Sequence, residues 1–218
     1  MAKLKTAVLI SGRGTNMQAL IDYCSAADAA AEIALVLSNI PDAAGLDRAA
    51  EANIPAIAID HKQFANRESF EDAVTKALED HDIQLVCLAG FMRLLTDRFV
   101  DHWRDRLINI HPSMLPAFKG LDTHERALAA GVRFTGCTVH YVRAEMDAGP
   151  IIVQAAVPIL PDDDPESLAM RVLVAEHRCY PYALSLIAEG KTQVIDEKVL
   201  IDGAQAPGAA FLNPTDNA

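Results

Sequence analysis

The sequence predicts an α/β fold, in which helices cover both faces of a mostly parallel β-sheet. Two observations support this prediction. Short apolar runs alternate with amphipathic helical stretches over the first half of the chain, and two β-rich runs, 135–142 and 151–157, follow with a polar loop between them. Alternating strands and helices are typical of parallel sheets that are buried on both sides. The two later runs are expected to form antiparallel strands at the sheet edge.

The individual elements follow from the spacing of apolar residues. Phe70, Val74, Ala77 and Leu78, for example, recur at helical spacing. Strands are expected where short apolar runs occur, at 6–10, 33–37, 56–59, 85–89 and 107–110. Helices are expected where the spacing is helical, at 15–24, 41–52, 67–80, 96–104 and 165–189.

Length and composition indicate one globular domain. The chain has 218 residues, of which 51% are hydrophobic and 22% are charged, and this length is enough to bury a core. We expect a single domain over 1–203, with an N-terminal part at about 1–105 and a C-terminal part at about 106–203. The segment 204–218 is rich in Ala, Gly, Pro and Asn, and we expect it to be a loosely ordered tail.

The charge and the apolar runs exclude several classes of partner. The formal net charge of −11 argues against nucleic acid, because phosphate contacts need clustered Lys and Arg. The apolar runs fall short of the roughly 20 residues of a membrane span, and the first one is too short for a signal peptide. The four cysteines form no C-x-x-C pair. We therefore expect a cytoplasmic protein with reduced thiols and without a nucleic-acid or membrane partner.

Asn109 and His111 stand two residues apart at the end of a predicted strand. Residues i and i+2 of a strand point to the same side, so both side chains are expected to face one point. An amide can donate to an oxyanion, and an imidazole can donate or accept a proton near neutral pH. Pro112 and Pro116 follow and end the strand, because proline has no N–H for the ladder.

A glycine-rich turn at 11–16, with the sequence SGRGTN, joins the first strand to the first helix. Backbone N–H groups and the dipole at a helix N-terminus favour a phosphate at such a turn. Met17 stands where the dinucleotide fingerprint has its third glycine, and no G-K-[ST] of a P-loop follows. A single phosphate therefore fits better than a pyrophosphate. The alternative is a turn that only caps the helix.

Two further segments carry candidate functional residues. The segment 89–95 (AGFMRLL) follows a predicted strand, at the carboxyl end where parallel sheets bind ligands. Its apolar side chains predict a flat slot for an aromatic heterocycle, with core packing as the alternative. The turn 145–150 (EMDAGP) contains Asp147. A carboxylate beside an imidazole favours the charged ring, so Asp147 is a candidate partner of His111, although a lone turn aspartate is usually only a turn former.

The remaining histidines and serines give weaker signals. His140 alternates within a predicted strand and is a minor candidate for the site, while His124 and His177 are ambiguous. The histidine spacings include no H-E-x-x-H, and we expect no metal. No G-x-S-x-G elbow surrounds Ser113, which argues against serine nucleophile catalysis.

Together these motifs resemble those of the phosphoribosylglycinamide formyltransferases, a family of folate-dependent enzymes. The resemblance runs from Val8 to about Leu186. The asparagine–histidine segment with a downstream Asp-x-Gly-Pro is specific to folate formyl transfer, and the glycine turn narrows it to this family. Ala148 stands where a glycine is frequent, and a small residue is expected to be tolerated. The segments that carry the resemblance are 10–16, 88–93, 109–113, 115–116, 136–140, 146–150 and 176–177.

The resemblance implies a Rossmann-like N-terminal part that holds a nucleotide and a C-terminal part that completes a folate site. It implies glycinamide ribonucleotide as substrate and 10-formyltetrahydrofolate as co-substrate, with the protein a monomer or a homodimer. The residues implied to bind the ribonucleotide are Gly14, Thr15 and Asn16 at the phosphate, Leu173, Val174 and Ala175 near the ribonucleotide, and Glu176 at the ribose. The residues implied to surround the folate are Arg67, Met92, Arg93, Leu94, Leu95, Asn109, Arg143, Ala144, Glu145, Met146 and Asp147.

The reaction implied by the resemblance moves a formyl group to the amine of the ribonucleotide in de novo purine biosynthesis. Asn109, His111 and Asp147 are the implied catalytic residues. Asn109 would donate to the oxyanion, His111 would supply a proton, and Asp147 would keep His111 charged. The reaction needs neither a metal nor a covalent enzyme intermediate.

Three alternatives accompany this interpretation. A formyltetrahydrofolate deformylase uses the same three residues but carries an extra N-terminal domain, whereas the core here begins almost at Met1. A methionyl-tRNA formyltransferase adds a C-terminal RNA-binding domain, for which we expect no room. A non-catalytic nucleotide-binding module would give Asn109, His111 and Asp147 no reason to occur together.

Overall fold

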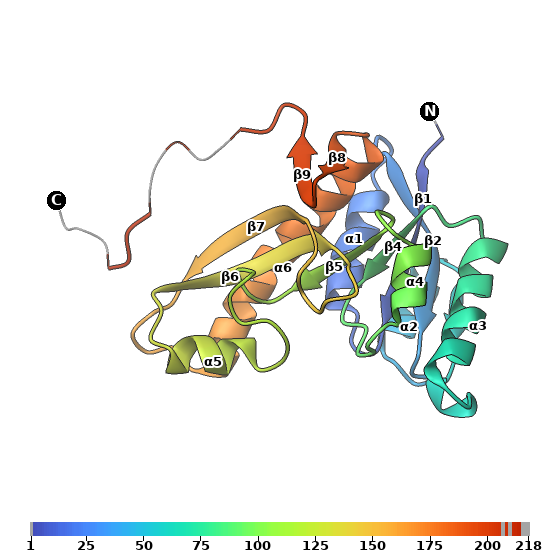
Figure 1. Cartoon of the computed structure of the whole chain (residues 1–218), viewed down its shortest axis with the longest axis horizontal. Helices are drawn as coiled ribbons and strands as arrows, with labels where there is room; N and C mark the ends of the chain where they lie inside the picture. Colours follow the sequence, from blue (N-terminus) through green and yellow to red (C-terminus); the bar gives the residue numbers. More distant parts are fainter. Residues whose placement is uncertain (1, 206–207, 209–210, 215–218) are drawn as a thin grey trace.

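The structure is a computed structural model that describes residues 2–205, 208 and 211–214. Seven strands form one sheet in the order β3-β2-β1-β4-β5-β6-β7 (Figure 1). The pairs from β3 to β5 are parallel, whereas β6 is antiparallel to both β5 and β7. The predicted α/β fold, with antiparallel strands at one edge, is therefore confirmed.

The observed elements match the expected ones closely in most places. The strands are β1 (Leu4–Ile10), β2 (Ala31–Ser38), β3 (Ala56–Ala58), β4 (Leu85–Leu88), β5 (Leu107–His111), β6 (Phe134–Tyr141), β7 (Ile151–Pro158), β8 (Thr192–Ile195) and β9 (Lys198–Ile201). The helices are α1 (Thr15–Cys24), α2 (Gly45–Glu51), α3 (Arg67–Asp80), α4 (Asp97–His102), α5 (Thr123–Ala129) and α6 (Pro165–Ala188), with a 3-10 turn η1 (His61–Gln63).

Three features differ from the sequence-based expectation. Helix α2 begins at Gly45 rather than near residue 41, because the Gly45 N–H donates to the carbonyl of Gly12 (2.9 Å) instead of continuing a helix backwards. Helix α5 and the β8–β9 hairpin were not expected. Helix α5 is short, and β8 and β9 are short strands that pair only with each other. None of them shows an extended periodic pattern of apolar residues.

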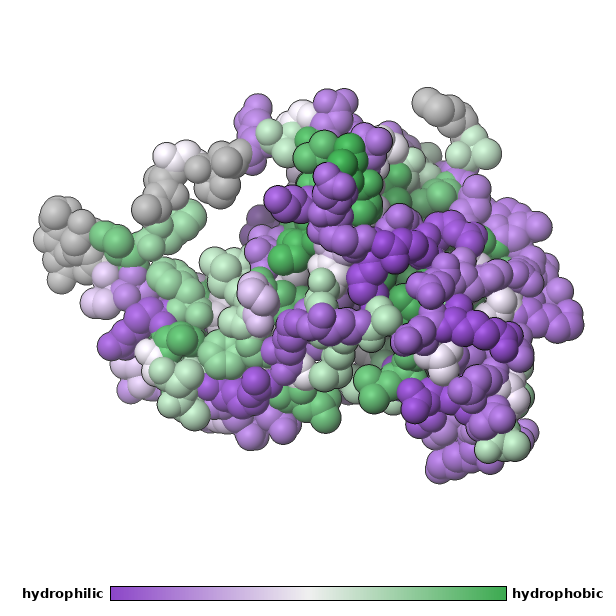
Figure 2. Space-filling model, viewed as in Figure 1, coloured by the Kyte–Doolittle hydropathy of each residue, from purple (hydrophilic) through white to green (hydrophobic). Residues whose placement is uncertain are grey.

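Alternation along the central strands divides the core into two layers. On β1, Val8 and Ile10 face a cluster that includes α1 and α6, whereas Ala7 and Leu9 face a cluster that includes α3 and α4. Figure 1 shows these two pairs of helices on opposite sides of the sheet. The surface over α3 and α4 is largely hydrophilic in Figure 2, as expected for helices that bury one side only.

The strand order places a binding crevice at one end of the sheet. The sequence runs β1-β2-β3 in one direction and continues with β4-β5 on the other side of β1. In such sheets the loops after the two central strands diverge, and a crevice forms outside their carboxyl ends. The glycine turn 11–16 follows β1 and the segment 89–95 follows β4, so both lie at this crevice.

The segment after β9 is described only in part. Positions 206–207, 209–210 and 215–218 of the expected loose tail lie outside the described residues. Asn213 is described, and its Nδ2 donates to the carbonyl oxygens of Arg133 (2.6 Å) and Ile159 (3.0 Å). Among the described helices, none combines the length and apolarity needed to cross a membrane.

The four cysteines are free in the described part of the chain, in agreement with the expected thiols. Cys87, Cys137 and Cys179 are buried, and Cys24 is partly buried. Burial raises the pKa of Cys24 to about 11, so this thiol stays protonated at neutral pH.

Candidate active site

A cavity of about 810 Å³ opens at the carboxyl ends of β4 and β5. The segment after β4 forms one wall, and the loop after β6 forms another. Its lining includes Gly90, Phe91, Met92, Arg93, Leu94, Leu95, Asn109, His111, Gly120, His124, His140, Arg143, Ala144, Met146 and Asp147. A cavity of this size that combines apolar walls with polar side chains gathered in one place is the usual form of a small-molecule site.

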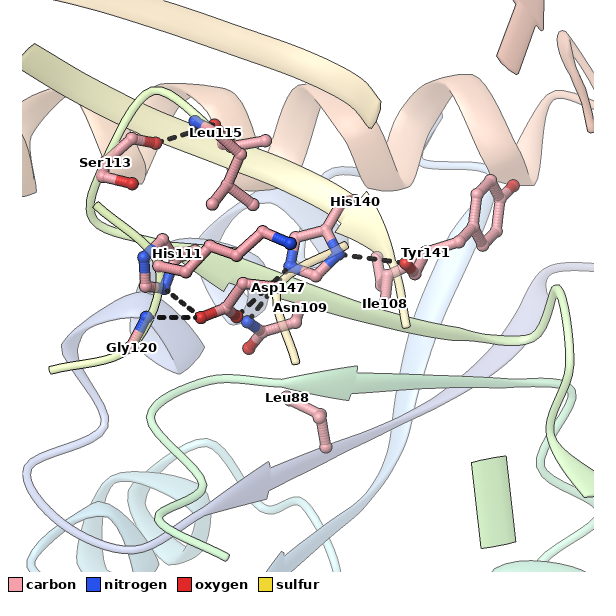
Figure 3. A network of polar contacts seen from close by, with 12 residues as sticks. Leu88, Ile108, Asn109, His111, Ser113, Leu115, Gly120, His140, Tyr141 and Asp147 are labelled. Atoms are coloured by element: carbon pink, nitrogen blue, oxygen red, sulfur yellow. Dashed lines mark hydrogen bonds and ion pairs between the residues drawn. The ribbon is translucent and has the colours of Figure 1, made fainter. Parts of the chain in front are cut away.

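Asn109, His111 and Asp147 meet in this cavity. Asn109 and His111 lie on β5, as their spacing predicts, and Asp147 comes from the loop after β6. The His111 Nδ1 atom lies 3.5 Å from Asp147 Oδ2, and the side chains are only 7% and 11% exposed. Figure 3 shows the two side chains facing each other beside Asn109. The structure therefore brings together two groups that are 36 positions apart in the sequence.

The tautomer of His111 follows from its second contact. Its Nε2 atom lies 3.0 Å from the carbonyl oxygen of Phe118, which can only accept. Nε2 therefore carries a proton, and Nδ1 is the atom that faces the carboxylate. A doubly protonated ring would donate from Nδ1 to Asp147 in the same orientation.

Asp147 is held by a second loop as well. Its Oδ2 atom accepts from the Gly120 N–H at 2.8 Å. The same two loops are joined at the surface by an ion pair between Lys119 and Glu145 (2.8 Å). The carboxylate is therefore oriented by a backbone donor before any ligand binds.

His140 belongs to the same network, although its alternation within a predicted strand is only a weak signal. It is the partner of Asn109 across β5 and β6, and it is 2% exposed. Its Nδ1 atom lies 3.0 Å from the Tyr141 carbonyl and must donate, so Nε2 accepts from Asn109 Nδ2 at 3.4 Å. Burial lowers the pKa of His140, against opposing effects of Tyr141 and Asp147. A neutral His140 thus fixes which way the Asn109 amide points.

The segment after β4 combines core packing with a cavity wall. Phe91 is 8% exposed and stacks on Phe70, whereas Met92 and Leu94 are 68% and 64% exposed at the cavity. Ser11 couples this segment to the glycine turn, because its Oγ accepts from the Met92 N–H at 2.8 Å. Core packing therefore applies to Phe91, whereas Met92 and Leu94 line the cavity, and a heterocycle between them stays a prediction.

Three residues of the expected folate set do not offer a free side chain to the cavity. Arg67 begins α3 and is exposed outside the cavity lining. Glu145 also lies outside it and pairs with Lys119. Arg143 lines the cavity, but its guanidinium donates to Glu197 and Asp105, at 2.6 and 2.7 Å.

The glycine turn lies at the N-terminus of α1, as expected. Gly14 is the residue before the helix and has a φ of 70°, in the left-handed region that favours glycine. A Cβ at this position would lie 3.0 Å from the Gly45 Cα atom. Among the described residues, no side chain caps α1, which leaves the first N–H groups of the helix available to an anion.

Gly14→Ala is expected to destabilise the protein by about 1–2 kcal/mol, because a Cβ is strained at positive φ and no space is available. Denaturant unfolding measures this change. Gly12→Ala is the matched control, since among the described residues no atom outside the two adjacent residues lies within 4 Å of a Cβ at Gly12. Equal stability of the two variants would contradict the expectation.

The turn also contacts α6, which carries the other residues expected at a nucleotide. Asn16 Nδ2 donates to Glu176 Oε2 at 2.7 Å, and Glu176 is 6% exposed. Burial raises the pKa of Glu176, while the bond from Asn16 acts in the opposite direction. The Asn16 Oδ1 atom is buried without a partner among the described residues. Of the adjacent residues, Val174 is 65% exposed, and Leu173 and Ala175 are partly buried.

The buried Glu176 carboxyl makes a pH-dependent contribution to stability. Its pKa is raised in the folded state, so the contribution is fully present below the unfolded pKa and is lost as the pH rises through the folded pKa. Glu176→Gln is therefore expected to raise the melting temperature near pH 8. The difference in melting temperature between this variant and the unmodified protein should narrow toward about pH 4. Glu166→Gln on the exposed part of α6 is the control. A gap that is independent of pH would contradict this explanation.

The sequence gives little or no signal for two groups of the site, the His140 ring that accepts from Asn109 and the Gly120 N–H that donates to Asp147. His140 needed the register of β5 against β6, which the sequence does not give. The Gly120 N–H is a backbone group, which no side-chain pattern can indicate. The only signal for it is the glycine itself, which permits a turn with positive φ. The described residues include no group of three or more His, Cys, Asp and Glu that could hold a metal ion.

Comparisons with known proteins connect this geometry to a family. The formyl transferase family model matches residues 4–184. The chain is 41% identical over 209 residues to the phosphoribosylglycinamide formyltransferase of Haemophilus influenzae, covering 96% of this chain and 99% of that protein. It is 52% identical over 192 residues to the trifunctional purine biosynthetic protein adenosine-3 of Gallus gallus. That match covers 88% of this chain, which spans only 19% of the length of the chicken protein.

Solved structures agree with the sequence relatives. The phosphoribosylglycinamide formyltransferase of Anaplasma phagocytophilum superposes with a TM-score of 0.87 at 46% identity, covering 93% of this chain and 95% of that one. A formyltetrahydrofolate deformylase of Pseudomonas syringae pv. tomato reaches 0.83 at 28% identity, covering 91% of this chain and 66% of the deformylase. This chain thus shares its fold with both enzymes, but its sequence is more similar to that of the transferase. The chain belongs to the formyl transferase family and, within it, to the phosphoribosylglycinamide formyltransferases.

Proposed function

We propose that this protein transfers a formyl group from 10-formyltetrahydrofolate to the amine of glycinamide ribonucleotide, as a step of de novo purine biosynthesis. The convergence of Asn109, His111 and Asp147 in one cavity carries the proposal. Membership of the family supports it, because relatives that match over nearly their whole length bear this name. The products are formylglycinamide ribonucleotide and tetrahydrofolate.

The ribonucleotide is proposed to bind between the glycine turn and α6. The N–H groups at the start of α1, from Gly14 to Asn16, suit its phosphate. Leu173 to Ala175 lie next to Glu176 on α6, and Glu176 is proposed to accept a hydrogen bond from a ribose hydroxyl. The bond from Asn16 to Glu176 supports this assignment, because it joins the two expected sets of residues in one place.

The folate is proposed to occupy the cavity. Met92, Leu94 and Leu95 supply apolar wall, and Arg93 has a buried Nε atom without a partner in the described chain. Ala144 and Met146 form the facing wall. Arg67 and Glu145 remain expectations from the resemblance, because they lie outside the lining of the cavity.

The residues suggest a direct transfer. The amine attacks the formyl carbon, its C–N bond forms, and the carbonyl electrons move to oxygen. The Asn109 amide, oriented by His140, donates to this oxyanion, and such a donor typically lowers the barrier by roughly 3–4 kcal/mol. The bond to the folate nitrogen then breaks, that nitrogen gains a proton from His111, and the proton of the attacking amine leaves by way of Asp147. No covalent bond to the protein forms.

One assay tests the proposal. The purified protein is mixed with 10-formyltetrahydrofolate, and release of tetrahydrofolate is followed with and without glycinamide ribonucleotide. Release that requires the ribonucleotide supports the transferase. Release without it would replace the proposal by the deformylase activity, which the similarity of fold to such an enzyme makes the second candidate. If tetrahydrofolate is released under neither condition, both enzymatic activities are contradicted, and a non-catalytic nucleotide-binding module is the alternative that remains.

The proposed substrates are two small molecules. The net charge of −11 disfavours a nucleic acid in their place, and we expect the reaction to take place in the cytoplasm. A monomer or a homodimer would serve equally, because all the residues invoked come from one chain.

A further inference from the structure

The Arg143 side chain is held at the edge of the candidate active site. Arg143 is the second residue after β6, at the start of the loop that carries Asp147. Its side chain is 11% exposed, and each of its three guanidinium nitrogens donates a hydrogen bond. The acceptors are the carboxylates of Glu197 (2.6 Å) and Asp105 (2.7 Å) and the Val142 carbonyl (3.0 Å).

These contacts join three separate parts of the chain. Glu197 forms the turn between β8 and β9, outside the segment that matches the family model. Asp105 lies two residues before the start of β5, the strand of Asn109 and His111. Figure 1 shows the β8–β9 hairpin beside the start of β7. Arg143 thus connects the hairpin to the strand and the loop that bear the three candidate catalytic residues.

The loop after Arg143 has little freedom once this side chain is fixed. Gly149 closes the loop, and a Cβ there would lie 1.7 Å from the Tyr141 carbonyl oxygen and 3.3 Å from the Arg143 Cγ atom. Asp147 lies between these two packed positions and has a φ of 51°. The orientation of its carboxylate therefore depends on where Arg143 anchors the loop.

The charges indicate that Arg143 acts through structure rather than by direct attraction of a ligand. Two carboxylates already balance its positive charge, and the hydrogen bond from Arg143 is the largest cause of the lowered pKa of Glu197. Glu197 also pairs with Arg104. Removing one partner of a largely buried ion leaves charge uncompensated, which favours movement of the arginine.

We propose that Glu197 is a positioning residue, which with Asp105 clamps Arg143 so that the loop 142–149 presents Asp147 to His111. The inference rests on the proposed formyl transfer and deepens it. It assigns a role to the β8–β9 hairpin, and it accounts for Arg143 in the cavity wall without a contact between its guanidinium and the folate.

Kinetics of Glu197 variants test the clamp. For Glu197→Ala we expect kcat/KM for 10-formyltetrahydrofolate to fall about tenfold, within the range that a small misplacement of reacting groups produces. The KM for glycinamide ribonucleotide should stay within about twofold, because Gly14, Asn16 and Glu176 lie outside the loop. For Glu197→Gln, kcat/KM for 10-formyltetrahydrofolate should lie between the values of Glu197→Ala and the unmodified protein, since the amide oxygen of glutamine still accepts from Arg143.

Hydrogen exchange provides a readout that does not depend on activity. The backbone amides of 142–149, and the Gly120 amide that donates to Asp147, should exchange faster in Glu197→Ala. Glu189→Ala is the matched control, because it removes a surface ion pair with Lys191 next to the same hairpin (2.6 Å) and leaves Arg143 untouched. It should show unchanged kinetics and unchanged exchange in the loop.

The outcomes separate the clamp from the proposed function. Wild-type kinetics and wild-type exchange in Glu197→Ala would overturn the clamp, as would an equal rise of both KM values with a general gain in exchange. If the unmodified protein shows no formyl transfer, the proposed function fails, and the exchange data still decide whether Glu197 orders the loop.

Discussion

His111→Ala is expected to lower kcat about 10²–10⁴-fold, the usual contribution of a general acid or base. The imidazole is the group in the cavity that carries a proton on Nε2 and faces a carboxylate through Nδ1. Its removal should act on the transition state, where the folate nitrogen must gain a proton. Both KM values should change by less than about threefold, because the ring supplies little of the binding surface.

His102→Ala is the matched control for this variant. His102 lies at the end of α4, is 45% exposed and pairs with Glu79 of α3, and neither residue lines the cavity. The control should retain normal turnover. Thermal unfolding of both variants separates loss of chemistry from loss of structure, and His111→Asn provides a second variant with a polar side chain. Near-normal turnover in a folded His111→Ala would contradict the assigned role.

The sequence predicted the architecture well wherever local pattern and global fold agree. The β1 and β2 strands are apolar runs because both faces of the sheet are covered, and α3 shows helical spacing because it buries one side. The β8–β9 hairpin has no such signal. Its strands are four residues each and half exposed, so their stability comes from packing that a local pattern does not record.

The part of the site that depends on local pattern was also predictable from the sequence. Asn109 and His111 share a side of β5 because a strand alternates, and this rule needs no tertiary information. The contact of His111 with Asp147 depends on how the loop after β6 folds back, and the role of His140 depends on strand register. The clamp on Arg143 involves Glu197, 54 positions away, which no short motif includes.

Asp147 offers a substitution that removes charge with little change of shape. Its backbone φ is 51°, a conformation that asparagine and aspartate adopt more readily than other side chains. An asparagine at this position can keep its Oδ1 atom as acceptor for the Gly120 N–H, which now bonds the carboxylate at 2.8 Å. Asp147→Ala would lose that bond and strain the backbone as well, so it would mix two effects.

Asp147→Asn is therefore expected to lower kcat about 10²–10⁴-fold, with both KM values within a few-fold of normal. The neutral amide leaves His111 without the negative charge that stabilises its protonated form at the moment of transfer. Asp82→Asn is the matched control, because Asp82 has a similar φ of 53° and pairs with Lys5 far from the cavity. If Asp147→Asn and Asp82→Asn turned over equally fast, the carboxylate would have no part in the chemistry, and Asp147 would only shape the loop.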